Sequence, residues 1–116
     1  MSVRVLLVDD HKYVRLGLHT ALSRDPNIQV IGEAADGAEA LELIRAQTFD
    51  ALFTDIKLPG PDGWVVAETF RAVCPDAPVV FATGYAPRYQ AFSHSILLNK
   101  PYRPAQVLQA FEKLAA

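Results

Sequence analysis

Five short segments of the chain are rich in apolar and β-branched residues, and polar or turn-forming residues follow each of them. These segments are 3–8, 28–34, 51–54, 78–83 and 96–98. Segments 3–8, 51–54 and 78–83 show little alternation between apolar and polar residues, which is typical of a strand buried on both faces of a parallel sheet. The pattern therefore predicts five strands and the burial of these three.

The segments between the strands repeat apolar residues at the three- and four-residue spacing of a helix with one buried face. This spacing predicts helices over 11–24, 36–47 and 64–73, and a last helix that begins at Pro104. Asp36 with Glu39 is typical of a helix start, as is Asp62, and proline suits the first position of a helix. The positions expected to be buried are Val14, Leu18, Ala21, Leu22, Ala40, Leu41, Ile44, Val66, Phe70, Val73, Val107, Leu108, Phe111 and Leu114.

The stretch 85–95 repeats its apolar residues only weakly, so we expect a short or irregular fourth helix there. Strands and helices then alternate five times with short connections. Such alternation predicts a parallel sheet with right-handed crossovers and helices on both faces. We expect a flavodoxin-like, doubly wound α/β domain with five parallel strands in the order 2-1-3-4-5. This single domain would occupy residues 1–116.

Length and composition limit the classes of protein to which the chain can belong. It has 116 residues, of which 51% are hydrophobic and 21% charged, as is typical of one globular domain. The net charge of −2 and the lack of a basic run argue against direct binding to nucleic acid. The apolar run near the amino terminus is too short for a signal peptide, so we expect none, and no apolar run approaches the roughly 20 residues that span a membrane. With Cys74 as the only cysteine, we expect a cytoplasmic protein.

Asp55 directly follows the apolar segment 51–54 and precedes a loop rich in proline and glycine at 59–63. In an open α/β sheet, the carboxyl ends of the strands form the edge at which ligands bind. The alternative is that Asp55 only caps the next helix, but the signal for that helix start lies later, at Asp62. The position therefore favours a functional role for Asp55.

Polar side chains also follow other strands of the predicted sheet: Asp9 and Asp10 follow the first, Thr83 ends the fourth and Lys100 follows the fifth. In the order 2-1-3-4-5 the first and third strands are neighbours, so both acids would share a pocket with Asp55. Two carboxylates about 5 Å apart repel by roughly 3 kcal/mol at an effective dielectric constant of about 20. A hard divalent cation such as Mg²⁺ would relieve this repulsion.

A hydroxyl, an ammonium group and a divalent cation around one carboxylate form a site for a transferred phosphoryl group. Each of these groups neutralises or hydrogen-bonds one of the phosphoryl oxygens. Taken singly, the residues say little, because an Asp pair often caps a helix and a lysine before proline is often solvated. The hypothesis rests on their conjunction at one edge of the sheet.

The chain resembles the receiver domains of two-component response regulators over nearly its whole length. The resemblance rests on LLVDD at 6–10, TDIKLPGPDG at 54–63, FATG at 81–84 and the pair Lys100-Pro101. It implies that Asp55 is the phosphoacceptor, that Lys100 is the counter-charge of the phosphoryl group and that Thr83 is the switch hydroxyl. It also implies a cis peptide bond between Lys100 and Pro101.

The resemblance implies a metal site as well. Mg²⁺ would be held by Asp10, Asp55 and the backbone carbonyl of Lys57. Asp9 would act on the ion through a water molecule. These four residues form the expected metal-binding set.

Two features depart from the usual receiver pattern. Receivers commonly carry an aromatic residue three positions before the lysine, and here that residue is Leu97. The stretch between Thr83 and Lys100 is also shorter than usual. Pro78 and the run FATGY at 81–85 are similar to a receiver subgroup with a Pro-Phe-x-Phe-Ala-Thr-Gly-Tyr signature, although Val79 replaces its first Phe. Comparable receivers end hybrid histidine kinases.

The expected function is a signalling switch that accepts a phosphoryl group on Asp55 from a histidine kinase or a histidine phosphotransfer protein and acts on a downstream protein target. We expect no enzymatic activity beyond its own phosphorylation and dephosphorylation. One alternative is an Mg²⁺-dependent phosphohydrolase of the haloacid dehalogenase type, which needs an acid where this chain has Lys57. Another is a flavodoxin-type flavin carrier, which needs a phosphate-binding loop where this chain has Asp9 and Asp10.

Overall fold

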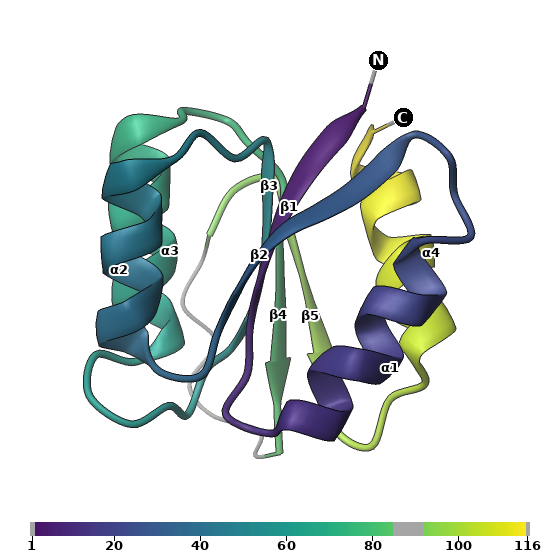
Figure 1. The fold of residues 1–116 in the computed structure, drawn as a ribbon, viewed down its shortest axis with the longest axis horizontal. Coiled ribbons are helices and arrows are strands. Elements are labelled where there is room, and N and C mark those ends of the chain that lie inside the picture. The colour runs from purple at the N-terminus through teal and green to yellow at the C-terminus, as the bar shows by residue number, and fades with distance from the viewer. Residues whose placement is uncertain (1, 85–91, 116) are drawn as a thin grey trace.

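The computed structural model of the protein describes residues 2–84 and 92–115. Its five strands form one parallel sheet in the order β2-β1-β3-β4-β5. The strands are β1 (Val3–Val8), β2 (Ile28–Ala34), β3 (Ala51–Asp55), β4 (Val79–Thr83) and β5 (Ser95–Asn99). The predicted flavodoxin-like α/β fold with strand order 2-1-3-4-5 is therefore confirmed (Figure 1).

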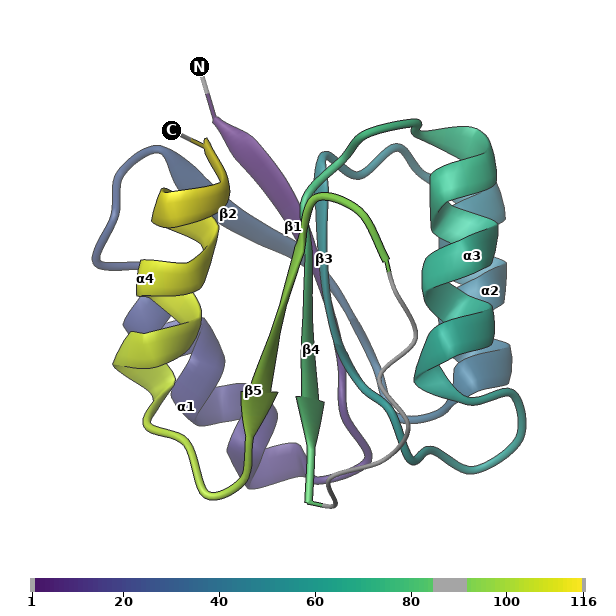
Figure 2. The ribbon, with the colours of Figure 1, turned by 180° about the vertical axis from the view of Figure 1, so that it is seen from behind.

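Helices cover both faces of the sheet, as the two opposite views show (Figures 1 and 2). The helices α1 (Lys12–Leu22) and α4 (Pro104–Ala115) lie on one face, and α2 (Gly37–Ala46) and α3 (Gly63–Val73) lie on the other. In the described part of the chain, no helix has both the length and the hydrophobicity that are needed to cross a membrane.

The hydrophobic core consists of two clusters, one on each side of the sheet. Val66 and Phe70 of α3 belong to one cluster with Phe81 of β4. Leu18 of α1 belongs to the other with Phe53 of β3. Every residue of β3 and β4 is buried, as the lack of polar alternation in these segments predicted. Because both of their faces are covered, these two strands form a rigid base for the residues at their carboxyl ends.

The predicted helix starts are confirmed by their hydrogen bonds. The backbone N–H of Glu39 donates to Oδ1 of Asp36 at 2.8 Å, and Glu39 Oε1 accepts from the backbone N–H of Ala35 at 2.9 Å. Asp62 accepts from the backbone N–H of Val65 at 3.0 Å. These bonds satisfy N–H groups that a helix start leaves without an intrahelical partner, and they fix where α2 and α3 begin.

Two of the predicted core positions are wrong. Val14 is 37% exposed and Val73 is 64% exposed. Val14 lies in the first turn of α1, where it lines an open groove toward Pro104, and Val73 is the last residue of α3. A side chain in a terminal turn has neighbours on fewer sides, so helical spacing alone does not bury it.

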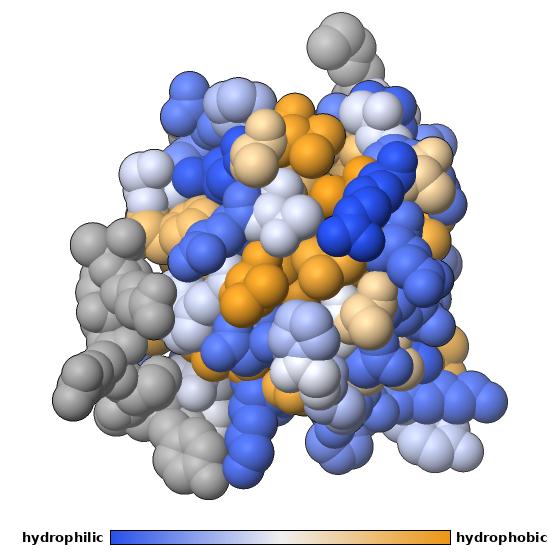
Figure 3. Space-filling model, turned by 90° about the vertical axis from the view of Figure 1, so that its left-hand side faces the viewer, coloured by the Kyte–Doolittle hydropathy of each residue, from blue (hydrophilic) through white to orange (hydrophobic). Residues whose placement is uncertain are grey.

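On the face formed by α2 and α3, apolar side chains reach the surface among hydrophilic ones (Figure 3).

The short or irregular helix predicted over 85–95 falls largely on 85–91, which lie outside the described residues. Phe92, Ser93 and His94 follow that segment and are not helical. Arg71 of α3 holds them in place: its guanidinium donates to the backbone carbonyls of Ser93 at 2.5 Å and His94 at 2.9 Å, and it lies 4.6 Å from the centre of the Phe92 ring. The Phe92 ring packs edge-on against Phe81, with centroids 5.3 Å apart.

Gly37 and Gly63 are the first residues of α2 and α3, and each lies against the backbone of the segment 55–61. Neither position has room for a Cβ atom. A Cβ atom on Gly63 would lie 2.2 Å from the backbone oxygen of Asp55, and one on Gly37 would lie 2.0 Å from the backbone oxygen of Pro61. The N–H of Gly63 also donates to the carbonyl of Ile56 at 2.7 Å. The start of α3 is thereby packed directly against the end of β3.

We predict that Gly63→Ala lowers the free energy of unfolding by about 1–3 kcal/mol, because the added methyl group overlaps a backbone atom of a buried strand. Gly17→Ala in α1 is the control, since its Cβ would approach no atom more closely than a Pro104 side-chain atom at 3.8 Å. Alanine inside a helix should raise the free energy of unfolding by about 0.5–1 kcal/mol. Urea denaturation measures both effects. A Gly63→Ala protein as stable as the unsubstituted one would contradict this account of the loop.

Candidate functional site

The carboxyl ends of the strands meet at an open cleft with a volume of about 700 Å³. The cleft is lined by Asp10, His11, Asp55, Lys57, Leu58, Pro59, Gly84 and Lys100. Four of the six predicted site residues are therefore brought together on its surface, namely Asp10, Asp55, Lys57 and Lys100. The remaining two, Asp9 and Thr83, are buried at the ends of β1 and β4.

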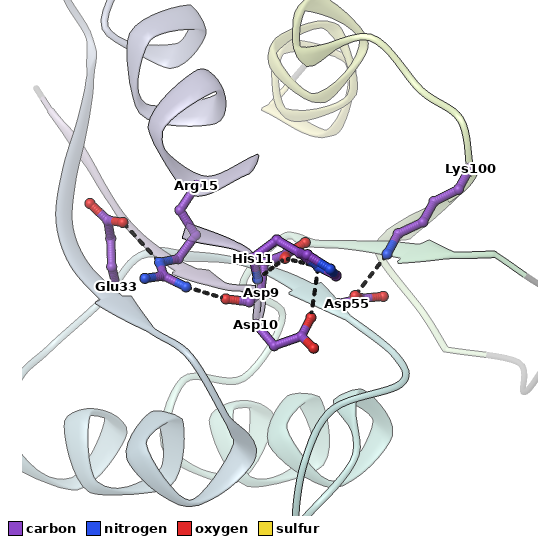
Figure 4. Close-up of polar contacts among 7 residues, drawn as sticks. All are labelled: Asp9, Asp10, His11, Arg15, Glu33, Asp55 and Lys100. Atoms are coloured by element: carbon purple, nitrogen blue, oxygen red, sulfur yellow. Dashed lines mark hydrogen bonds and ion pairs between the residues drawn. The ribbon is translucent and has the colours of Figure 1, made fainter. Parts of the chain in front are cut away.

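Asp55 is the last residue of β3, and its side chain is buried. The Nζ atom of Lys100 lies 2.8 Å from Oδ2 of Asp55, so the two side chains form an ion pair across the cleft (Figure 4). The backbone N–H of Lys100 also donates to the carbonyl of Thr83 at 2.7 Å. This bond ties the ends of β4 and β5 together and fixes the lysine relative to the carboxylate. The peptide bond between Lys100 and Pro101 is cis, as expected.

Asp9 directly follows β1 and is completely buried. Its Oδ1 atom accepts a hydrogen bond from the backbone N–H of His11 at 2.8 Å, whereas its Oδ2 atom is buried with no hydrogen-bond partner among the described residues. Burial raises the pKa of the Asp9 carboxyl, the hydrogen bond from His11 opposes this shift, and the nearby negative charge of Asp55 adds to it. The site therefore holds a carboxylate whose charge the protein compensates only in part.

The acidic end of β1 has the donors that a divalent cation needs. The carboxylates of Asp9 and Asp10 and the imidazole of His11 offer three ligand atoms within 4.8 Å of one another. A cation next to Oδ2 of Asp9 would satisfy a buried charged oxygen, which is costly to leave without a partner. Asp9, Asp10 and His11 therefore have the ligand atoms and the spacing to bind a metal ion.

Arg15 and Glu33 support the acidic pair, and sequence reasoning missed them both. The NH1 group of Arg15 donates to the backbone carbonyl of Asp9 at 2.5 Å, and its Nε donates to Oε1 of Glu33 at 3.1 Å (Figure 4). The contacts link α1 and β2 to the end of β1, so they hold the backbone that carries the acids. The sequence held no signal for them, because charged residues on a helix and on an edge strand are usually solvated.

The chain is similar to known proteins over nearly its whole length. A family model for the response regulator receiver domain matches residues 5–112. The probable transcriptional regulatory protein NarL of Mycobacterium tuberculosis is 37% identical over 99% of this chain, and the chain spans 46% of the length of that relative.

Two solved structures are similar over almost the whole chain. A response regulator receiver protein from Sinorhizobium medicae WSM419 has 31% identity and a TM-score of 0.86 over 97% of this chain and 94% of its own. The signal receiver domain of the putative response regulator NarL from Mycobacterium tuberculosis has 34% identity and a TM-score of 0.83 over 98% of this chain and 96% of its own. The chain therefore belongs to the response regulator receiver domains of two-component systems, and it is a phosphorylation-dependent switch of that family.

Proposed function

We propose that Asp55 is the phosphoacceptor of this switch and receives its phosphoryl group from a histidine kinase or a histidine phosphotransfer protein. The observation that carries the proposal is the ion pair between Asp55 and Lys100, at 2.8 Å, in a cleft that Asp10 also lines. A histidine kinase partner follows from membership of the receiver family.

In the proposed reaction, one carboxylate oxygen of Asp55 attacks phosphorus while the bond from phosphorus to the donor's leaving group breaks. The leaving group departs with the electron pair of that bond, and an acyl phosphate forms on Asp55. Lys100 then lies beside the new phosphoryl oxygens and neutralises part of their charge. Thr83, buried at the end of β4, would supply a hydroxyl to the phosphoryl group.

We propose Mg²⁺ as the metal of the cleft, held by Asp10, Asp55 and the backbone carbonyl of Lys57, with Asp9 acting through water. Oxygen ligands of this kind suit Mg²⁺, which retains several of its water molecules in proteins. The bound ion would supply positive charge that stabilises the phosphoryl oxygens during transfer. The buried Oδ2 of Asp9, which has no hydrogen-bond partner among the described residues, supports a cation at this position.

We further propose that the chain turns over no external substrate, since Lys57 stands where a hydrolase of the haloacid dehalogenase type requires an acid. Its output would be contact with a downstream protein in the cytoplasm rather than direct contact with nucleic acid or membrane. Membership of the receiver subgroup with the FATGY signature, or of the receivers of hybrid kinases, stays a prediction. The relative reported above is a NarL-type regulator.

We predict that Asp55→Asn abolishes phosphorylation by a small phosphodonor such as acetyl phosphate in the presence of Mg²⁺, because an amide oxygen is a far weaker nucleophile than a carboxylate. Intact-protein mass spectrometry should show one added phosphoryl group on the unsubstituted protein and none on the variant. Asp62→Asn is the matched control, since asparagine caps a helix as well as aspartate does. Phosphorylation of the Asp55→Asn protein would show that another residue is the acceptor.

A second prediction concerns the metal. Saturating Mg²⁺ should raise the thermal midpoint relative to EDTA, because an ion at 100 times its dissociation constant adds roughly 2.7 kcal/mol when it binds only the folded state. Asp10→Asn should lose most of this gain. Glu42→Gln removes one negative charge from the exposed face of α2 and should keep it. An equal gain in the Asp10→Asn protein would place the ion elsewhere.

A third prediction follows from the pKa of Asp9, which burial raises. Folding then favours the protonated carboxyl, so the charged form lowers the free energy of unfolding at neutral pH. This penalty disappears as the pH falls through the raised pKa to the ordinary value of about 3.9. In EDTA, Asp9→Asn should therefore be more stable than the unsubstituted protein at pH 7 but not near pH 4. Denaturant melts across this range, with Glu42→Gln as the charge-matched control, measure the difference. A difference that does not vary with pH would refute the assignment.

A further inference from the structure

His11 is the N-cap residue of α1 and lines the cleft beside the acidic pair. Its side chain is 69% exposed, and its Nδ1 atom lies 3.1 Å from Oδ1 of Asp10 and 3.5 Å from Oδ1 of Asp9 (Figure 4). The backbone N–H of His11 donates to the same oxygen of Asp9. The ring nitrogen therefore faces both carboxylates from a loop that is anchored to one of them.

These separations match the distances between neighbouring ligands of a single metal ion. Donors about 2.1 Å from an octahedral ion lie about 3.0 Å from their neighbours, and donors about 2.1 Å from a tetrahedral ion lie about 3.4 Å apart. The three ligand atoms lie within 4.8 Å of one another. A single ion can therefore contact Asp10 and His11 directly and lie close to Asp9, and the exposed ring of His11 has room for the small adjustment that this needs.

The state of Asp9 is a second and independent indication of a ligand. Its side chain is completely buried, and its Oδ2 atom has no hydrogen-bond partner within residues 2–84 and 92–115. The other carboxylate oxygen is already used by the backbone of His11. A buried charged oxygen of this kind calls for a cation or a donor group.

We propose that Asp9, Asp10 and His11 form a mixed oxygen and nitrogen site, in which the imidazole of His11 gives the cleft a preference for a first-row transition-metal ion over Mg²⁺. The inference rests on the proposed function, because this ion would share Asp10, and Asp9 through water, with the proposed Mg²⁺ site. Imidazole nitrogen is a good ligand for Co²⁺, Ni²⁺ and Zn²⁺, whereas Mg²⁺ takes oxygen ligands. His11 is then the residue that determines which divalent cation the cleft selects.

The test is to titrate the unsubstituted chain, His11→Phe and His19→Phe with CoCl₂ and with MgCl₂ by isothermal titration calorimetry, and to record the visible absorption of the Co²⁺ complexes. Phenylalanine keeps a planar ring and the backbone N–H but removes the imidazole nitrogens. Loss of a ligand should weaken Co²⁺ binding by about tenfold or more, since even outer-shell substitutions cost about that much. Mg²⁺ affinity should change by less than about twofold. His19→Phe removes an exposed imidazole outside the cleft and should change neither affinity.

The outcomes separate this inference from the proposed function. A weaker Co²⁺ complex with an altered absorption spectrum in His11→Phe, together with unchanged Mg²⁺ affinity, supports a nitrogen ligand. Equal changes in the two affinities, or identical Co²⁺ spectra, overturn the proposal and leave His11 as an ion-pair neighbour of the acids. If the unsubstituted chain binds Co²⁺ through His11 but binds no Mg²⁺, the inference stands and the proposed role of Mg²⁺ fails. If it binds neither ion, both fail.

Discussion

The site depends on the burial of two carboxylates, those of Asp9 and Asp55, at one edge of the sheet. Burial disfavours the charged form of a carboxylate, and a like charge nearby adds to the cost, as the raised pKa of Asp9 indicates. Lys100 offsets this cost for Asp55 through an ion pair at 2.8 Å. The Oδ2 atom of Asp9 has no such partner in the described part of the chain. The fold thus maintains an unbalanced negative charge beside the proposed phosphoacceptor, and a bound cation would balance it.

Short backbone contacts hold the groups of the site in position. Arg15 binds the backbone carbonyl of Asp9, the close approach of Gly63 fixes α3 against the carbonyl of Asp55, and the backbone of Lys100 is bonded to that of Thr83. All three contacts act on the ends of buried strands, which cannot shift without disturbing the core. The cleft is therefore arranged before any ligand binds, so little ordering would be required when a phosphoryl group or a cation enters it.

The sequence by itself determined the fold and the carboxylates and lysines that line the cleft, for reasons that lie in local chemistry. Strands without polar alternation must be covered on both faces, so the segments around Phe53 and Phe81 predicted a central parallel sheet. Parallel strands point their carboxyl ends to the same edge, so the acids after β1 and β3 and the lysine after β5 had to approach one another. Helix starts at Asp36 and Asp62 were also predictable, because a cap is an interaction between residues only three positions apart.

Only the tertiary structure decided which long side chains reach across the fold and which helix positions are left uncovered. Arg15 and Arg71 are ordinary solvated residues by sequence, yet each binds backbone carbonyls of another element, because its reach depends on what the fold places opposite it. The ring of Phe92 packs against Phe81 of β4, an aromatic contact that the apolar spacing around Leu97 did not predict. Val73 follows the apolar spacing of its helix but is exposed. Helical periodicity specifies which residues share a face, whereas burial requires a neighbour across from that face, and only the assembled fold determines where such neighbours lie.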